Sequence, residues 1–489
     1  MQNMQNMQNM VTASPLPPLS SLRPPPPGES GRPPTVIVAG AGIAGLCAAD
    51  ALARAGAQVR VFEASGEVGG RMRTDTLGGH RIECGAQFLS AGYTVLPQLA
   101  QRLGLAGEIG MASQVNAVVR QGRPRRVRAD SLFDPLRSGL LGLPGWLRLG
   151  LALSGERHGL QTLPLDDLGR WTCYDRESAS HWLAHRGCAD ALAYVTEPML
   201  QGLYFLAPET TSAALAMMAS GFGWRRHATT SLAGGMQSLP RALARTLDVE
   251  LNRRVESIRQ HGAGVMVAGA GFSASADYVV CALPAPLAQR VWQGTDPLER
   301  RLLASGYSRT INLSLLTRPG FRVPASLAGT YGLLVPRGER RHVAALALEA
   351  GKRHHGGPRD AQERGQVVQA MLEDGAAATL MGASDTQLLA EVLPEIERYL
   401  PGISRQLQDA RITRWEQAMP HVPVGRAADV LAYRTRADAA QGRIFLAGDY
   451  VNAPFTDAAA ASGQWAAAAI LRAAAQAAPA RHAAGHEGG

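Results

Sequence analysis

Short apolar runs, separated by glycine-rich turns and by segments with helical spacing, mark the beginning of the ordered sequence. Residues 36–39 form a continuous apolar run, typical of a strand buried in a parallel sheet. Apolar side chains then recur at helical spacing over residues 46–53, and residues 60–62 have the composition of a second strand. This order of elements predicts a βαβ unit over residues 35–64.

Further along the chain the pattern changes. The segments INLSLLT (311–317) and HVAALALE (342–349) favour strands, because β-branched and apolar residues dominate them. Residues 444–447 (IFLA) predict a short buried strand, and the alanine-rich stretch that follows Gly448-Asp449 predicts a helix. A second strand–turn–helix unit is therefore expected about 400 residues after the first.

Composition narrows the class of protein. The chain has 489 residues, of which 46% are hydrophobic and 18% charged, as expected for folded domains. The net charge of +9 comes almost wholly from scattered arginines, since Lys352 is the only lysine, and no nucleic-acid partner is expected. The one dense basic cluster, residues 120–128, predicts a solvated hairpin or a surface loop. The five cysteines form no CxxC pair, which favours reduced thiols in the cytoplasm.

The most apolar segment covers residues 138–155, and Pro144 and Arg148 interrupt it. It is too short to span a membrane. We expect a buried helix here. The alternative is an amphipathic element lying on a membrane surface, so that peripheral membrane contact remains open.

The turn after the first strand reads Gly40-Ala41-Gly42-Ile43-Ala44-Gly45. In a GxGxxG turn the first glycine permits the sharp bend, the second allows a pyrophosphate to approach, and the third lets the helix pack on the strand. Glu63 and Ala64 end the second strand, where a carboxylate can bind ribose hydroxyls. The motif predicts dinucleotide binding, and a glutamate disfavours NADP. NAD and FAD both remain open at this point.

The next motifs, GEVGGRMRT (66–74) and GHRIECGAQF (79–88), resemble those of the flavin-containing amine oxidase superfamily. The resemblance implies FAD, with Gly70 and Arg71 near a phosphate or the flavin. It also implies that the flavin edge is lined by four consecutive residues: Gly85, Ala86, Gln87 and Phe88. The later segments implied to contact FAD are the Val255 backbone at the adenine, Trp415 near the flavin, Gly448 and Asp449 at the pyrophosphate and ribityl chain, and the helix start at Asp457 and Ala458.

The middle of the chain, residues 177–214 above all, is most similar to protoporphyrinogen-oxidase-like enzymes. The resemblance and the residue patterns together predict an α/β protein. Its Rossmann-like FAD domain, with a parallel sheet, is assigned to residues 34–91, 231–292 and 409–475. Its substrate domain, part helical and part antiparallel (α+β), is assigned to residues 92–230 and 293–408. Residues 1–33 and 476–489 are expected to be a disordered leader and tail.

The expected function is FAD-dependent oxidation of a ring C–H next to nitrogen or carbon, giving a C=N or C=C bond. The electron acceptor is O₂ or another small acceptor. Three alternatives stay open: an amine or amino-acid oxidase, a protoporphyrinogen oxidase, and an FAD-binding protein without turnover. Non-covalent FAD is expected because no cysteine follows Cys281. A typical monoamine oxidase is disfavoured because residues 306–321, where such enzymes carry a lysine near the flavin, contain none.

No catalytic residue is assigned. The candidate pocket residues are Gln87, Tyr204, His421 and Phe455. The alignment places Asn116 where protoporphyrinogen oxidases carry a propionate-binding arginine, with Arg120 as the alternative after a register shift; asparagine favours a less acidic substrate. No metal site is expected, because the sequence has no HExxH or clustered ligand set, and His354-His355 lies in a glycine-rich loop.

Overall fold

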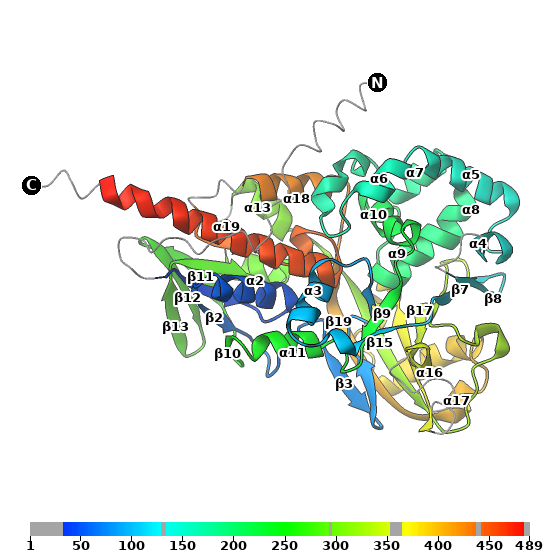
Figure 1. The fold of residues 1–489 in the computed structure, drawn as a ribbon. Helices are drawn as coiled ribbons and strands as arrows, with labels where there is room; N and C mark the ends of the chain where they lie inside the picture. Colours follow the sequence, from blue (N-terminus) through cyan, green and yellow to red (C-terminus); the bar gives the residue numbers. More distant parts are fainter. Residues whose placement is uncertain (1–32, 129–133, 293–295, 353–363, 437–441, 484–489) are drawn as a thin grey trace, which may run out of the picture.

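The computed structural model describes residues 33–128, 134–292, 296–352, 364–436 and 442–483 (Figure 1). The predicted leader is outside these ranges up to residue 32, and so is His354-His355. The βαβ pattern is confirmed by a five-stranded parallel sheet in the order β10-β2-β1-β14-β20. Its strands are β10 (Asp248–Glu250), β2 (Gln58–Phe62), β1 (Thr35–Ala39), β14 (Tyr278–Cys281) and β20 (Ile444–Leu446).

Two helices from distant parts of the chain lie together on this sheet. Helix α2 (Ile43–Arg54) is almost entirely buried, and the long helix α19 (Thr456–Ala483) packs along it. The contact is close, since a Cβ atom on Gly463 would lie 2.0 Å from the Ala44 carbonyl oxygen. Residues 476–483 continue α19, so the disordered tail predicted from residue 476 is wrong up to Ala483. The alanine-rich sequence explains this, because alanine has the highest helix propensity.

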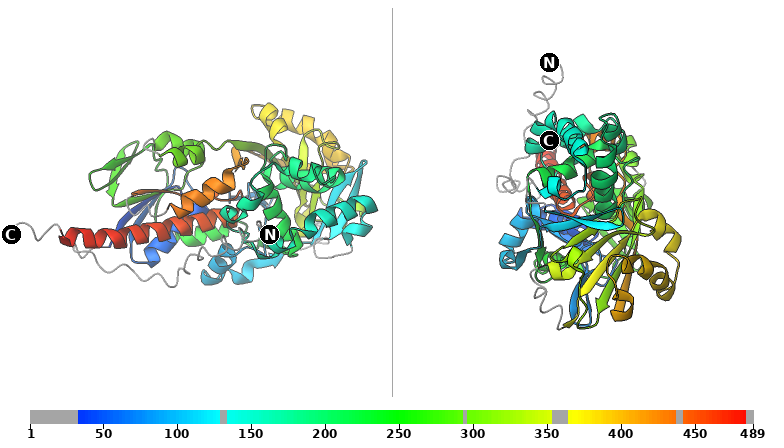
Figure 2. Two further views of the ribbon diagram at one scale, coloured as in Figure 1. Left: turned by 90° about the horizontal axis from the view of Figure 1, so that it is seen from above. Right: turned by 90° about the vertical axis from the view of Figure 1, so that its right-hand side faces the viewer.

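A second, seven-stranded sheet lies at the opposite end of the molecule (Figure 2). Its strands, in spatial order, are β19 (Leu407–Pro420), β15 (Tyr307–Thr317), β18 (Val367–Leu372), β17 (Val343–Leu348), β16 (Gly332–Leu334), β7 (Val115–Arg120) and β8 (Arg123–Arg128). All neighbours are antiparallel except β16 and β7. β15 and β17 confirm the strands predicted from their apolar patterns, and β7–β8 confirms the basic hairpin. Strand β19 pairs with β15, so residues 409–420 lie in this sheet.

A layer of helices lies beside the two sheets, and further helices pack around them (Figures 1 and 2). The helical layer comprises α4 (Asp134–Arg137), α5 (Leu143–Ser154), α6 (Arg157–Thr162), α7 (Ala179–Ala184), α8 (Ala189–Ala191), α9 (Glu197–Tyr204) and α10 (Ala213–Trp224). The other helices are α3 (Val95–Arg102), α11 (Ser238–Ala244), α12 (Ala285–Val291), α13 (Pro297–Leu303), α15 (Asp374–Leu380), α16 (Asp385–Glu397), α17 (Ile403–Gln406) and α18 (Arg426–Thr435).

Three small sheets complete the fold. They are formed by β3 (Thr74–Leu77) with β4 (His80–Glu83), by β5 (Leu89–Ser90), β9 (Thr229–Leu232) and β6 (Ile109–Met111), and by β11 (Ser257–His261), β12 (Gly264–Gly269) and β13 (Phe272–Ala276).

Helix α5 shows that the prediction of a buried helix over residues 138–155 is wrong. Leu143, Leu147 and Leu151 are 70%, 59% and 74% exposed, and they recur every four residues on one face. The opposite face carries Trp146 and Leu149, which line the large cavity described below. The apolar residues of α5 therefore lie on two faces, one exposed to solvent and one lining the cavity. Contact of the exposed face with a membrane surface stays a prediction. No helix in the described part of the chain has the length and apolarity needed to cross a bilayer.

Candidate active site

The glycine-rich turn between β1 and α2 has the geometry of an anion site. Gly40 has a φ of +103°, and its amide donates to the Phe62 carbonyl oxygen at 2.8 Å. Gly45 is held against this turn, since a Cβ there would lie 2.0 Å from the Gly40 carbonyl oxygen. Gly42 differs, because a Cβ on it would have no neighbour within 4 Å. It is the N-cap of α2, which has no side-chain cap, so its first-turn amides suit a phosphate.

Glu63 closes the turn from the end of β2. One carboxylate oxygen accepts from the Ala41 amide at 2.8 Å, and the other accepts from the Ser65 amide at 2.9 Å. Beside it is a cavity of about 270 Å³, lined by Ala64 and Val255 among others. The predicted adenine contact with Val255 thus has a cavity next to the carboxylate that is predicted to bind ribose. The residues present fit a dinucleotide.

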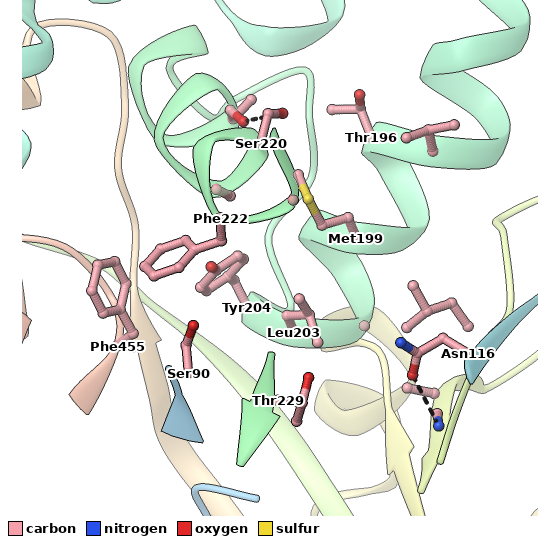
Figure 3. Close-up of a pocket in the computed structure, with 18 of the residues that line it drawn as sticks. Ser90, Asn116, Thr196, Met199, Leu203, Tyr204, Ser220, Phe222, Thr229 and Phe455 are labelled. Carbon is pink, nitrogen blue, oxygen red and sulfur yellow. Dashed lines mark hydrogen bonds between the residues drawn. The ribbon is translucent and has the colours of Figure 1, made fainter. Parts of the chain in front are cut away.

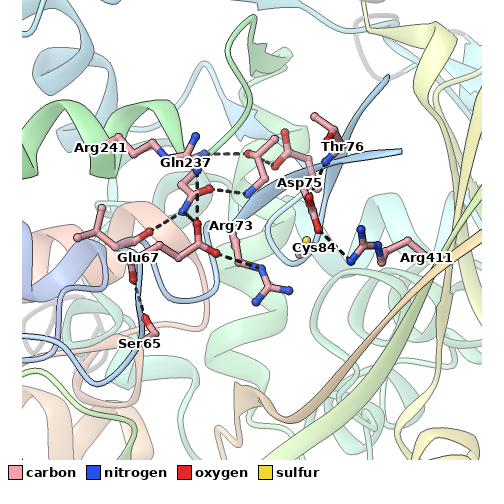
Figure 4. A network of polar contacts seen from close by, with 12 residues as sticks. Ser65, Glu67, Arg73, Asp75, Thr76, Cys84, Gln237, Arg241 and Arg411 are labelled. Atoms are coloured by element: carbon pink, nitrogen blue, oxygen red, sulfur yellow. Dashed lines mark hydrogen bonds and ion pairs between the residues drawn. The ribbon is translucent and has the colours of Figure 1, made fainter. Parts of the chain in front are cut away.

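The loop over residues 66–74 is bonded to this turn through its backbone and is held in place by a buried glutamine, Gln237 (Figure 4). The Gly69 amide donates to the Ala41 carbonyl oxygen at 2.9 Å. Gln237 donates to the Glu67 carboxylate at 2.8 Å and to the Val68 carbonyl oxygen at 2.7 Å, and it is fully buried. No sequence pattern pointed to Gln237. Its partners become apparent only in three dimensions.

Arg71 and Asp449 contact each other. The guanidinium donates to both Asp449 oxygens at 2.6 and 3.0 Å and to the Ala418 carbonyl oxygen at 2.7 Å. The sequence had directed Arg71 to a phosphate or the flavin, and Asp449 to the ribityl chain. Because Asp449 is buried, it requires a charged partner, and Arg71 supplies one. Gly448 precedes it with a φ of +142°, a conformation that favours glycine.

The Asp457 side chain is directed away from the expected flavin position. Its carboxylate accepts hydrogen bonds from the amides of Thr94, Val95 and Leu96 at 2.8–3.0 Å and so caps helix α3. Burial raises the pKa of Asp457 to about 6, although these amides oppose the shift. A cofactor contact at Asp457 or Ala458 would therefore use backbone amides at the start of α19.

The segment Gly85–Phe88 lines a second cavity, of about 740 Å³. The segment lies tightly against the preceding loop, since a Cβ on Gly85 would lie 2.2 Å from the Arg71 carbonyl oxygen. Trp415 supports it from β19, with the indole nitrogen donating to the Cys84 carbonyl oxygen at 2.7 Å. The Gln87 amide nitrogen donates to the Glu83 and Gly85 carbonyl oxygens. Its Oε1 atom is buried without a hydrogen-bond partner in the described structure.

Three of the four candidate pocket residues line this cavity: Gln87, Tyr204 and Phe455. Phe455 stacks on Tyr93 at 5.8 Å and meets the edge of Phe222 at 5.7 Å (Figure 3). His421 does not line it, so that prediction was wrong. It is exposed on the outer side of the fold, where its amide donates to the Gly306 carbonyl oxygen at 2.8 Å. β19 ends at Pro420, immediately before it.

The charged side chains in the described cavity lining are all positive. None of the described lining residues is an aspartate, glutamate or lysine, and the arginines among them are Arg128 and Arg226. Asn116 lines the cavity, as its alignment predicted, with Oδ1 accepting from the Gly332 amide at 3.1 Å (Figure 3). Arg120 is outside the lining, where it donates to the Leu140 carbonyl oxygen and its guanidinium carbon lies 4.5 Å from the Tyr194 ring centroid. Asn116, and not Arg120, thus lines the cavity.

A buried charged cluster lies behind the cavity wall. Lys352 Nζ is 2.7 Å from a Glu349 carboxylate oxygen, and both side chains are almost fully buried. The ammonium is 5.6 Å from the ring centroid of Tyr331, which faces the cavity. Burial alone would lower the pKa of Lys352, but Glu349, Tyr331 and Glu83 reverse this effect and raise it. The only lysine therefore stays charged beneath the pocket without lining it.

Glu83 gives a testable pH dependence. Burial raises the pKa of this carboxyl from 4.5 to about 7, against the opposing effect of Lys352. Between these two pH values the folded protein retains a proton that the unfolded chain has released, so the free energy of unfolding falls as pH rises. Glu83→Gln is expected to remove up to about 3 kcal/mol of this loss between pH 5 and 8. Urea unfolding of both flavin-loaded proteins measures it. An unchanged slope in Glu83→Gln would contradict the assignment.

Three features occur together: a parallel sheet, a glycine-rich turn leading into a helix without a side-chain cap, and a large apolar cavity. This is the arrangement of a flavin-dependent oxidoreductase. Residues 43–471 match the family of flavin containing amine oxidoreductases, and the chain belongs to this family. The family's cofactor implies FAD, and its members are enzymes.

Known proteins place the chain between two groups of enzymes. Coproporphyrinogen III oxidase of Mycobacterium tuberculosis is 26% identical over 437 residues, covering 82% of this chain and 89% of the relative. A solved structure from Exiguobacterium sp. 255-15, provisionally assigned as a protoporphyrinogen oxidase, has a TM-score of 0.71 at 19% identity and covers 90% of this chain and 98% of that one. Cyclohexylamine oxidase from Brevibacterium oxydans has a TM-score of 0.70 at 20% identity, with coverages of 90% and 99%. These two structures establish the shared fold.

Proposed function

We propose that the protein is an FAD-dependent oxidase or dehydrogenase of a large, mostly apolar ring compound, on which it creates a C=N or C=C bond. FAD, bound without a covalent link, would accept a hydride and pass two electrons to O₂ or another acceptor. The sequence around the expected flavin position on the C-terminal side, residues 444–463, contains neither cysteine nor histidine for a tether. The observation that carries the proposal is the 740 Å³ cavity opening on Gly85–Phe88.

The cavity walls determine what the chain contributes. Aromatic side chains, including Trp182, Tyr204 and Phe222, provide flat apolar surfaces that orient a ring and exclude water. Asn116 and Gln87 offer polar atoms at separate points of the wall. Gln87 Oε1 can accept a hydrogen bond from a donor placed at Gly85–Phe88. No described side chain in the lining is positioned to carry a covalent intermediate.

The cavity favours some substrates over others by charge. An alkylammonium substrate would normally require a carboxylate or an aromatic cage with acidic support, and the described lining has no carboxylate. This supports the ring compound over a simple amine. The two arginines of the lining weaken the expectation of a less acidic substrate. Arg128 and Arg226 can pair with carboxylates even though Asn116 cannot.

A porphyrinogen carrying carboxylates is therefore the second candidate. The two lining arginines favour it, as does the similarity to the mycobacterial coproporphyrinogen oxidase over most of both chains. Under this alternative Arg128 and Arg226 would hold the carboxylates, and Arg120 would have no direct role.

The test is anaerobic flavin bleaching against a panel of coproporphyrinogen, protoporphyrinogen, cyclic imines, pyrrolines, benzylamine and aliphatic amines. We expect bleaching by one ring compound and none by the simple amines. If the substrate carries carboxylates, Arg226→Ala should raise its KM about tenfold or more, while the control Arg120→Ala leaves KM unchanged. Rapid bleaching by benzylamine or aliphatic amines would overturn the proposal, and a flavin bleached by no member would favour a binding protein without turnover.

A further inference from the structure

Three side chains of metal-ligand type come together beside α7, in the helical layer and outside the cavity lining. Glu177, His181 and His185 follow one another at intervals of four residues. His181 lies in α7, Glu177 precedes the N-cap residue Ser178, and His185 is the C-cap, so the two ends of this short helix bring the three side chains together. The sequence had been expected to hold no metal site, but the segment ESASHWLAH contains this repeat.

The distances between the ligand atoms are those of a coordination shell. Nδ1 of His181 is 3.1 Å from Glu177 Oε2, and Nδ1 of His185 is 3.7 Å from the same oxygen. One ligand atom of each residue lies within 4.8 Å of the others. Around a tetrahedral zinc ion with bonds of about 2.0–2.2 Å, neighbouring ligand atoms are roughly 3.3–3.6 Å apart. Small rotations of exposed side chains would therefore bring all three onto one ion.

The neighbouring arginine, Arg186, does not occupy the carboxylate oxygen of Glu177 that faces the two histidines. Arg186 approaches Glu177 on the other carboxylate oxygen, Oε1, at 3.9 Å, and its guanidinium carbon lies 4.0 Å from the Trp182 ring centroid. Oε2 therefore faces the two imidazoles. The His181 and His185 side chains are 57% and 61% exposed, so an ion can reach them from solvent.

We propose that Glu177, His181 and His185 bind a divalent transition-metal ion, with zinc as the ion to test. Two imidazoles and a carboxylate suit zinc, nickel and copper, whereas calcium and magnesium prefer oxygen ligands alone. The fourth position of a tetrahedral zinc ion would be open to water.

The position of the site gives it a structural consequence. Helix α7 has only six residues, and its other face contributes Ala179, Trp182 and Leu183 to the cavity wall. An ion joining three residues across two turns binds the folded helix only, so it stabilises that part of the wall. The ion therefore tightens the substrate cavity from outside without touching its contents.

The test uses flavin-loaded full-length protein stripped with EDTA and titrated calorimetrically with ZnCl₂. We expect His181→Ala, His185→Ala and Glu177→Gln each to weaken the strongest zinc binding about tenfold or more, since each removes one ligand of three. The matched control is His158→Ala, which removes an exposed helical histidine from α6. Flavin absorbance and far-UV circular dichroism establish that each variant is folded.

Comparison of the variants decides the outcome because other groups on the surface can also bind zinc. Loss in the three ligand variants with wild-type affinity in His158→Ala supports the site. Equal affinity in wild type and the ligand variants overturns it and leaves Glu177 as an ion-pair partner only. An equal loss in His158→Ala overturns it as well, since the binding would then be non-specific.

Discussion

Replacing Gly42 with valine is expected to give a folded protein that purifies with almost no flavin. Gly42 has an ordinary φ of −70°, and a Cβ there would meet no protein atom within 4 Å. The side chain would instead enter the space in front of the α2 amides, where a pyrophosphate must approach. The measurement is the ratio of flavin to protein absorbance, together with circular dichroism. We expect flavin occupancy to fall about tenfold or more.

The matched control is Gly45→Val, the same substitution three residues further along. It acts by a different mechanism. Its Cβ would lie 2.0 Å from the Gly40 carbonyl oxygen, which is backbone and cannot move cheaply. Gly45→Val should lose flavin, and its flavin-free form should also be less stable than flavin-free wild type. Gly42→Val should lose flavin, but its flavin-free form should be as stable as flavin-free wild type. Full flavin occupancy in Gly42→Val would contradict the assignment of this turn to the cofactor.

Lys352→Met is expected to destabilise the protein by about 3–5 kcal/mol, because it leaves the buried Glu349 carboxylate without its cation. Methionine has a similar length, so the loss would reflect charge more than volume. Urea unfolding at pH 7.5 measures the change. The double variant Lys352→Met with Glu349→Leu should recover much of the loss, since removing both charges is often neutral.

The control for this prediction is Arg341→Met. Arg341 pairs with Glu391 at 2.6 Å but is 72% exposed, so its removal should cost less than about 1 kcal/mol. Equal losses in Lys352→Met and Arg341→Met would show that the Lys352–Glu349 pair is solvated in solution.

The dinucleotide half of the site could be predicted because its signals are local. Gly40, Gly42 and Gly45 set the turn, the apolar run before them sets the strand, and Glu63 ends the next strand. Each of these features depends on residues within about 30 positions of one another, the length of a βαβ unit. The glycine contacts then follow from the same local geometry, whereas the cavity beside Glu63 also needs residues 253–256 and 283–291.

The features that could not be predicted depend on partners far along the chain. Arg71 was directed to the cofactor because nothing near it in sequence suggests Asp449, which is 378 residues away. Asp457 caps a helix from another segment, and His421 is exposed just after the end of β19, outside the cavity lining. The apolar pattern of α5 indicates a helix, but it does not say which face another element covers.

The pairing of β20 with β14 and of α19 with α2 has a consequence for how the protein matures. About 400 residues of translation separate the end of β1 at Ala39 from the start of β20 at Ile444. The glycine-rich turn therefore emerges from the ribosome long before the Asp449 segment and the helix that packs on it. Contacts of such sequence separation form slowly, and domains with them depend on non-local closure. We therefore expect flavin to be captured only after the chain is complete, so that a nascent chain halted before residue 444 should not retain the cofactor.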